Sequence, residues 1–215
     1  MRRIKGSLVA AATIACLFSM STGGVGLASA QAAATTLCSV AQETCALGNR
    51  KEAGTLLEMS STQVTFVNTV SNVTCGGGSF KAATQAVQGE PLAASISAAN
   101  APVFVNCTRE GGQACSATSV NTPYNAEIEW TAANNGTFKM TNGGSGAAAL
   151  DLKCGILIKC RYNVEVQYTM EGGNPAEIKI AGAVLERISG LCPTETQLVV
   201  TYTVNAPNPV YVAHV

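Results

Sequence analysis

The feature that most constrains this chain is a strict alternation of apolar and polar residues that recurs along it. Residues 162–170 show it most clearly, with apolar side chains at every even position and polar side chains between them. Residues 124–132, 177–188 and 197–205 repeat the pattern. Successive side chains of a β-strand point to opposite faces of the sheet, so this period of two predicts half-buried antiparallel strands. No segment has the spacing typical of an amphipathic helix.

Each of these segments is expected to turn one face to the core. The expected core faces are Tyr124, Ala126, Ile128, Trp130 and Ala132; Tyr162, Val164, Val166, Tyr168 and Met170; Ile178, Ile180, Gly182, Val184 and Ile188; and Leu198, Val200, Tyr202 and Val204. Asn134-Asn135-Gly136 and residues 171–175 are predicted to form hairpin turns, because Asn and Gly adopt positive φ at low cost. The glycine runs at 76–78, 111–112 and 143–146 predict further breaks between strands. These features predict an all-β fold, either an antiparallel β-sandwich (immunoglobulin-like or jelly-roll-like) or a β-barrel.

Residues 1–30 have the pattern of a secretory signal peptide. A positively charged start, MRRIK, is followed by the mostly apolar residues 6–20 and by Ala28-Ser29-Ala30, a small-x-small cleavage pattern. A helix that spans a bilayer needs about 20 apolar residues, so the shorter stretch fits a signal better than an anchor. We expect cleavage after Ala30, or after one of the alanines that follow it closely. Residues 31–215 would then form a single secreted domain, outside the cell or in its envelope.

The charge of the processed chain excludes one class of partner. Loss of the three basic residues of the leader leaves ten basic and thirteen acidic residues, a net charge of about −3. No basic patch is present, so no nucleic-acid partner is expected. No second apolar stretch approaches 18 residues, so no membrane span is expected after cleavage.

An even number of cysteines remains after cleavage. They are Cys38, Cys45, Cys75, Cys107, Cys115, Cys154, Cys160 and Cys192. Eight cysteines in an exported chain predict disulfides. A zinc site is not expected, because the chain has no C-x₂-C pair and a single histidine, and no other cofactor is expected. Cys154 and Cys160 could pair only if the chain reverses between them, and the residues alone leave a turn and a continuous strand equally open.

Six motifs occur in an order that resembles a group of small exported bacterial proteins. They are TCALGNRKEAGT, NVTCGGGSF, the run FVNC to CSATSVNTPYNAEI, CGILIKCRY, GGNPAEI and LCPTETQLVVTYTVNAPNPVYV, and they cover most of residues 36–213. The resemblance implies export, disulfides and β-structure, and it carries no catalytic motif. It also implies that closely spaced cysteines form local clamps. The implied pairs are Cys38–Cys45, Cys107–Cys115 and Cys154–Cys160, with Cys75–Cys192 as a longer staple.

Few side chains could perform catalysis. His214 is expected to lie in a frayed tail, so a Ser-His-Asp triad with Asp151, the only aspartate, is not favoured. Glu127 and Glu129 share a strand face about 7 Å apart, a separation that an inverting glycosidase could use. The same two residues also fit the solvated face of an amphipathic strand. Trp130 points to the opposite face and is expected in the core near a disulfide.

These observations favour a non-catalytic binding or structural role with an extracellular or cell-wall partner. The first alternative is a small secreted carbohydrate hydrolase that uses Glu127 and Glu129. The second is a secreted inhibitor or toxin, including a pore former built from strands such as 62–74. The residues do not decide the oligomeric state.

Overall fold

We describe a computed structural model of the chain that covers residues 33–144 and 146–215. The expected signal peptide, residues 1–30, lies outside the described residues. The described part contains sixteen strands and two short 3₁₀ helices. In chain order they are β1 (Thr35–Cys38), η1 (Leu47–Asn49), β2 (Leu56–Ser61), β3 (Val64–Val67), β4 (Val73–Thr84), β5 (Gln88–Gly89), β6 (Leu92–Ile96), η2 (Ala98–Asn100), β7 (Val103–Arg109), β8 (Cys115–Val120), β9 (Tyr124–Ala132), β10 (Asn135–Asn142), β11 (Ala149–Cys154), β12 (Ile158–Asn163), β13 (Gln167–Glu171), β14 (Glu177–Gly190), β15 (Glu195–Ala206) and β16 (Tyr211–His214).

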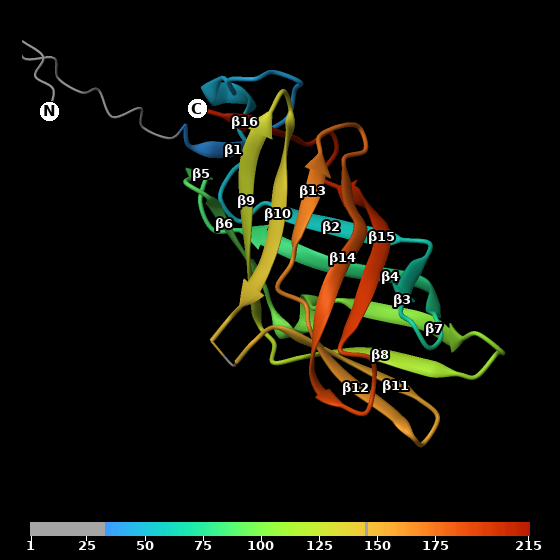
Figure 1. Cartoon of the computed structure of the whole chain (residues 1–215). Helices are drawn as coiled ribbons and strands as arrows, with labels where there is room; N and C mark the ends of the chain where they lie inside the picture. The colour runs from blue at the N-terminus through green and yellow to red at the C-terminus, as the bar shows by residue number, and fades with distance from the viewer. Residues whose placement is uncertain (1–32, 145) are drawn as a thin grey trace, which may run out of the picture. The chain divides into compact units, whose positions relative to one another are not determined.

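Three long strands, β4, β14 and β15, organise the main sheet. β4 pairs with β2 and β3 along one edge and with β6 and β7 along the other, while β15 joins β14 to β2 and β3. As a result the pairing closes on itself twice. One ring runs β2–β4–β6–β9–β10–β13–β14–β15, and the other runs β3–β4–β7–β8–β11–β12–β14–β15. In Figure 1, β9, β10, β13 and β14 cross in front of β2 and β4, so that two layers face each other. This arrangement confirms the all-β, antiparallel, barrel-like or sandwich-like class.

β4 belongs to both rings, and its glycines allow the strand to turn odd-numbered side chains to the core in its first half and even-numbered side chains in its second half. Val73 and Cys75 are buried in one half, Phe80 and Ala82 are buried in the other, and the parity changes at the consecutive buried residues 77 and 78. A Cβ on residue 78 would lie 3.0 Å from Val64 Cγ2, and one on residue 77 would lie 3.1 Å from the Ser61 carbonyl oxygen. The prediction of a break at residues 76–78 is therefore wrong: these glycines lie inside a strand, at a close approach to its neighbours.

A β-bulge divides β14 in the same way. Gly182 has a φ of 84°, a conformation that other residues rarely adopt, and the register against β15 shifts between Ala181 and Ala183. Ile178 and Ile180 are buried before the bulge, as expected. After it, Leu185 is buried, whereas Val184 and Ile188 are exposed, so the prediction of one continuous face over 177–188 is wrong for its second half.

Residues 162–170 are not one strand. β12 ends at Asn163 and β13 begins at Gln167, and the backbone N–H of Glu165 donates a hydrogen bond to Asn163 Oδ1 in the connection. The break allows β12 to pair with β11 and β14, and β13 to pair with β10 and β14. The expected apolar face is confirmed for Tyr162, Val164, Tyr168 and Met170, which are buried, while Val166 in the connection is half-buried.

Both predicted hairpins are confirmed, but the first turn lies at residues 133–134, and Asn135 and Gly136 already belong to β10. β9 and β10 are joined through Asn134, which has a φ of 67°. Residues 172–176 join the antiparallel pair β13 and β14. The predicted faces of residues 124–132 and 197–205 are also confirmed in β9 and β15, except that Ala132 is exposed at the end of β9.

A small sheet, β16–β1–β5, holds the carboxyl terminus. His214 pairs with Thr35 in this sheet, and its Nε2 lies 3.1 Å from Thr44 Oγ1. The expectation of a frayed tail is therefore wrong. Trp130 is half-buried against the core, and its ring meets the imidazole edge-on at 4.8 Å.

All eight predicted cysteines form disulfides, but only one expected pair is present. The bonds are Cys38–Cys45, Cys75–Cys107, Cys115–Cys154 and Cys160–Cys192. The pairs Cys107–Cys115, Cys154–Cys160 and Cys75–Cys192 are wrong. Strand register explains two of the observed bonds, because Cys75 lies directly opposite Cys107 and Cys115 directly opposite Cys154.

The segment from Cys154 to Cys160 is a hairpin without a disulfide of its own. The chain reverses at residues 155–157, and register places Cys154 opposite Ile158 and Cys160 opposite Leu152. The two sulfur atoms therefore do not face each other. Cys160 lies opposite Gly190 at the end of β14, which brings it close to Cys192 in the following loop.

Candidate functional site

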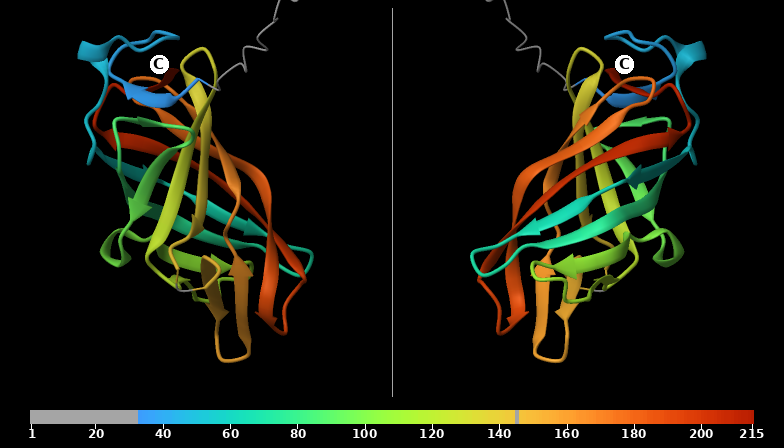
Figure 2. Two further views of the ribbon diagram at one scale, coloured as in Figure 1. Left: turned by 90° about the vertical axis from the view of Figure 1, so that its left-hand side faces the viewer. Right: turned by 90° about the vertical axis from the view of Figure 1, so that its right-hand side faces the viewer.

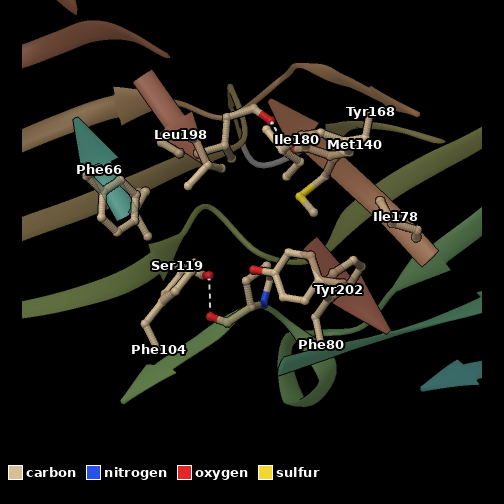
Figure 3. Close-up of a pocket in the computed structure, with 14 residues that line it drawn as sticks. Phe66, Phe80, Phe104, Ser119, Met140, Tyr168, Ile178, Ile180, Leu198 and Tyr202 are labelled. Atoms are coloured by element: carbon tan, nitrogen blue, oxygen red, sulfur yellow. Dashed lines mark hydrogen bonds between the residues drawn. The ribbon is translucent and has the colours of Figure 1, made fainter. Parts of the chain in front are cut away.

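The centre of the fold contains a small interior cavity (Figure 3). Its volume is about 30 Å³, enough for about one water molecule. Aromatic rings form much of its wall, including Phe80 and Tyr202, which meet edge-on at 5.0 Å. Burial raises the pKa of Tyr168 and of Tyr202, since the phenolate would lie in an apolar interior. The cavity is a packing feature of the core and is too small for an organic ligand.

A larger pocket opens at one end of the described part, and we name it the disulfide-end pocket. Its lining residues are Asn68, Thr69, Val70, Ser71, Val73, Arg109, Leu152, Cys154, Ile158, Cys160, Tyr162, Leu191, Cys192 and Pro193. Its volume is about 310 Å³, which lies at the lower end of the range found for ligand sites, about 300–1,000 Å³. The lining is mostly apolar, and Arg109 is its only charged member.

Two disulfides fix the loops that surround the disulfide-end pocket. Cys154 is bonded to β8 and Cys160 to the β14–β15 loop. The Tyr162 hydroxyl donates a hydrogen bond of 3.3 Å to the Pro193 carbonyl, and burial raises the pKa of this tyrosine. The guanidinium of Arg187 donates a hydrogen bond to the Cys192 carbonyl. The pocket is thus held open by covalent and polar links, as expected of a preformed site.

The rim of the pocket carries exposed apolar side chains. Val70 and Leu191, which line the mouth, are 68% and 99% exposed. Ile156 and Leu157, at the neighbouring hairpin tip, are 87% and 86% exposed. Figure 2 shows the β11–β12 hairpin and the β14–β15 loop projecting from the same end. Exposed apolar groups that cluster in this way mark interaction sites more often than isolated ones do.

Sequence reasoning missed this site. The residues alone left a turn and a continuous strand open for this segment, and Ile156 and Leu157 form the tip of a turn. Two consecutive apolar residues between strands, directly after Gly155, were the signal that could have indicated an exposed apolar tip. Arg109 gave no signal, because its place in the pocket depends on strands distant in the chain.

The structure does not bring the candidate catalytic residues together into a site. Glu127 and Glu129 lie on β9, half-buried and exposed, and neither lines the interior cavity or the disulfide-end pocket. Asp151 accepts hydrogen bonds of 2.7 and 3.1 Å from Arg161, whose guanidinium holds the pKa of this carboxyl below its usual value. His214 instead contacts Thr44 and Trp130.

Residues 33–144 and 146–215 contain no group of three or more His, Cys, Asp or Glu side chains that could hold a metal ion. In the same residues no helix has the length and apolar character needed to cross a membrane.

Comparisons with protein families, with curated proteins and with solved structures give no match to this chain.

Proposed function

We propose that this protein is an exported, non-catalytic binding protein that uses the disulfide-end pocket. The observation that carries the proposal is an apolar pocket of about 310 Å³ held open by two disulfides and surrounded by exposed apolar loops. Binding sites for small molecules are typically concave, mostly apolar and largely preformed. The four disulfides support export, since such bonds persist mainly in oxidising compartments. The partner therefore lies outside the cell or in its wall.

Nile red, a neutral apolar dye whose emission shifts to the blue in an apolar environment, tests the proposal. The protein should bind it saturably with a blue shift. Ile158→Trp places a large ring in the pocket and should weaken binding about tenfold or more, because the space is small. Val184→Trp is the matched control, since it adds the same ring at an exposed apolar position outside the pocket lining.

Thr69→Trp provides a second filling variant from the exposed loop between β3 and β4, in case the change at residue 158 disturbs folding. Far-UV circular dichroism checks that each variant is folded. Equal dye affinity in the unmodified protein and in a folded filling variant would contradict the proposal, as would the absence of saturable binding.

A further inference from the structure

The register of β4 and β7 places a cation on the inner face of the sheet, at the mouth of the disulfide-end pocket. Arg109 lies directly opposite Val73, whose side chain is buried. Residues directly opposite each other in an antiparallel pair lie on the same face. Cys107, two residues before Arg109 on β7, bonds inward to Cys75 and confirms which face this is. The side chain of Arg109 therefore lies on the pocket side of β7, in agreement with its place in the pocket lining.

The charge of Arg109 has no partner within the described residues. None of the ion pairs found in residues 33–144 and 146–215 involves it, and its side chain makes no hydrogen bond there. The neighbouring Glu110 follows the end of β7, and its Oε1 accepts a hydrogen bond of 2.8 Å from Asn72 Nδ2. The rest of the pocket lining is uncharged. A guanidinium without a partner beside an apolar pocket binds an anion better than it binds a neutral group.

The loop beside Arg109 offers a polar group as well. Ser71 lines the pocket two residues before Val73, and its Oγ is buried without a hydrogen-bond partner in the described part of the chain. A buried hydroxyl without a partner destabilises the fold, because it has lost its hydrogen bonds to water. A polar head group that enters beside this loop could supply the missing partner. The apolar remainder of the pocket, and its exposed apolar rim, require the rest of the ligand to be apolar.

We infer that the ligand of the disulfide-end pocket is a single-chain amphiphile with an anionic head, an inference that rests on the function proposed above. The chain lies against Leu152, Ile158 and Tyr162, and the head pairs with Arg109. The volume of about 310 Å³ suits one alkyl chain and not a two-chain lipid. A carboxylate and a phosphate share the required chemistry, since both accept two parallel hydrogen bonds from a guanidinium.

Displacement of Nile red by ligands of equal chain length tests the inference on the unmodified protein. Dodecanoate and dodecyl phosphate, below their micellar concentrations, should compete about tenfold or more better than dodecanol, because each adds hydrogen bonds to a charged group. Tighter binding of either anion supports the inference and identifies the head. Dodecyltrimethylammonium should compete less well than dodecanoate, since its charge repels the guanidinium.

Two substitutions at residue 109 then test whether the preference for anionic over neutral ligands comes from Arg109. Arg109→Gln should bring dodecanoate and dodecanol to equal affinity, and Arg109→Lys should restore part of the difference. Arg161→Gln is the matched control, because that arginine is already paired with Asp151 outside the pocket, and it should leave the preference unchanged.

The possible failures are distinguishable. Equal competition by dodecanoate and dodecanol overturns the assignment of an anionic amphiphile but leaves an apolar binding site in place. An anion preference that persists unchanged in folded Arg109→Gln overturns the role of that arginine. A lack of Nile red binding by the unmodified protein removes the proposed function itself.

Discussion

The bulge at Gly182 predicts that two isoleucines of the same strand differ sharply in their contribution to stability. Ile178 is fully buried at 0% exposure, whereas Ile188 is 49% exposed. Substitution by alanine removes three carbon atoms, and at about 0.8 kcal/mol for each buried methylene this costs about 2.4 kcal/mol at the buried site. The cavity left behind raises the expected cost of Ile178→Ala to about 3–4 kcal/mol. Ile188→Ala should cost about 1 kcal/mol or less, because half of its surface already contacts water.

Urea unfolding with the disulfides intact, followed by circular dichroism, measures these differences. With a slope of about 2 kcal/mol per molar urea, the two unfolding midpoints should differ by about 1 M. Leu185→Ala is a second test, because this residue is fully buried only if the strand exchanges faces at the bulge. In a strand without the bulge, Ile188→Ala would lower the free energy of unfolding strongly and Leu185→Ala only slightly. Equal costs at 178 and 188 would refute the assignment of faces.

Three further predictions concern backbone and titrating groups. Gly182→Val should lower the free energy of unfolding by about 1–2 kcal/mol in the same urea assay, because φ at this residue is 84°. The nearest atom to the new Cβ lies 3.6 Å away, so the loss comes from backbone conformation and not from a steric clash. An unchanged unfolding midpoint would contradict the bulge. Arg161 lowers the pKa of Asp151, so the stability from this pair is present above the unfolded pKa of about 4 and is lost as pH falls through the lower folded value. Asp151→Asn should therefore cost about 0.5–1 kcal/mol near neutral pH, and the difference from the unmodified protein should disappear towards pH about 2; a pH-independent difference would argue against the ion pair. Burial raises the pKa of Tyr168 and Tyr202, so their phenols should stay protonated in the folded protein at pH about 11 and ionise on unfolding. Absorbance near 295 nm, compared between native and urea-unfolded samples, measures this ionisation. Free titration of both tyrosines in the native sample would contradict the prediction.

The local pattern of the chain was sufficient to predict its secondary structure class and several of its strands. The alternation in 124–132 and 197–205 matches β9 and β15 closely, because each side chain needs only its own strand to define its face. Asn134 marked a hairpin turn for an equally local reason, since its positive φ is a property of the turn itself. The identity of the eight disulfide cysteines could also be predicted, from their even number in a chain that is expected to be exported.

The functional site required the tertiary structure. Arg109 and Leu152 are far apart in the chain, and the pairing of β7 with β8 and of β8 with β11 brings them to one pocket. Their residue types fit many other surroundings, so no sequence pattern distinguishes them. The change of buried face beyond Gly182 could not be predicted for a related reason. A glycine in a strand is compatible with a bulge, a close approach or a turn, and the sequence does not distinguish them.

The sequence by itself therefore determined that this protein is built from antiparallel strands linked by disulfides, since side-chain alternation and cysteine number are properties of the chain. Only the tertiary structure decided which strands are neighbours, and with them the sulfur partners and the pocket. Cys107 illustrates the difference. It bonds to Cys75 on β4 and not to Cys115, which is nearer in the sequence, because the pairing of β4 with β7 places Cys75 directly opposite it. Partner choice of this kind depends on contacts summed over the whole sheet, and no local pattern of residues contains that sum.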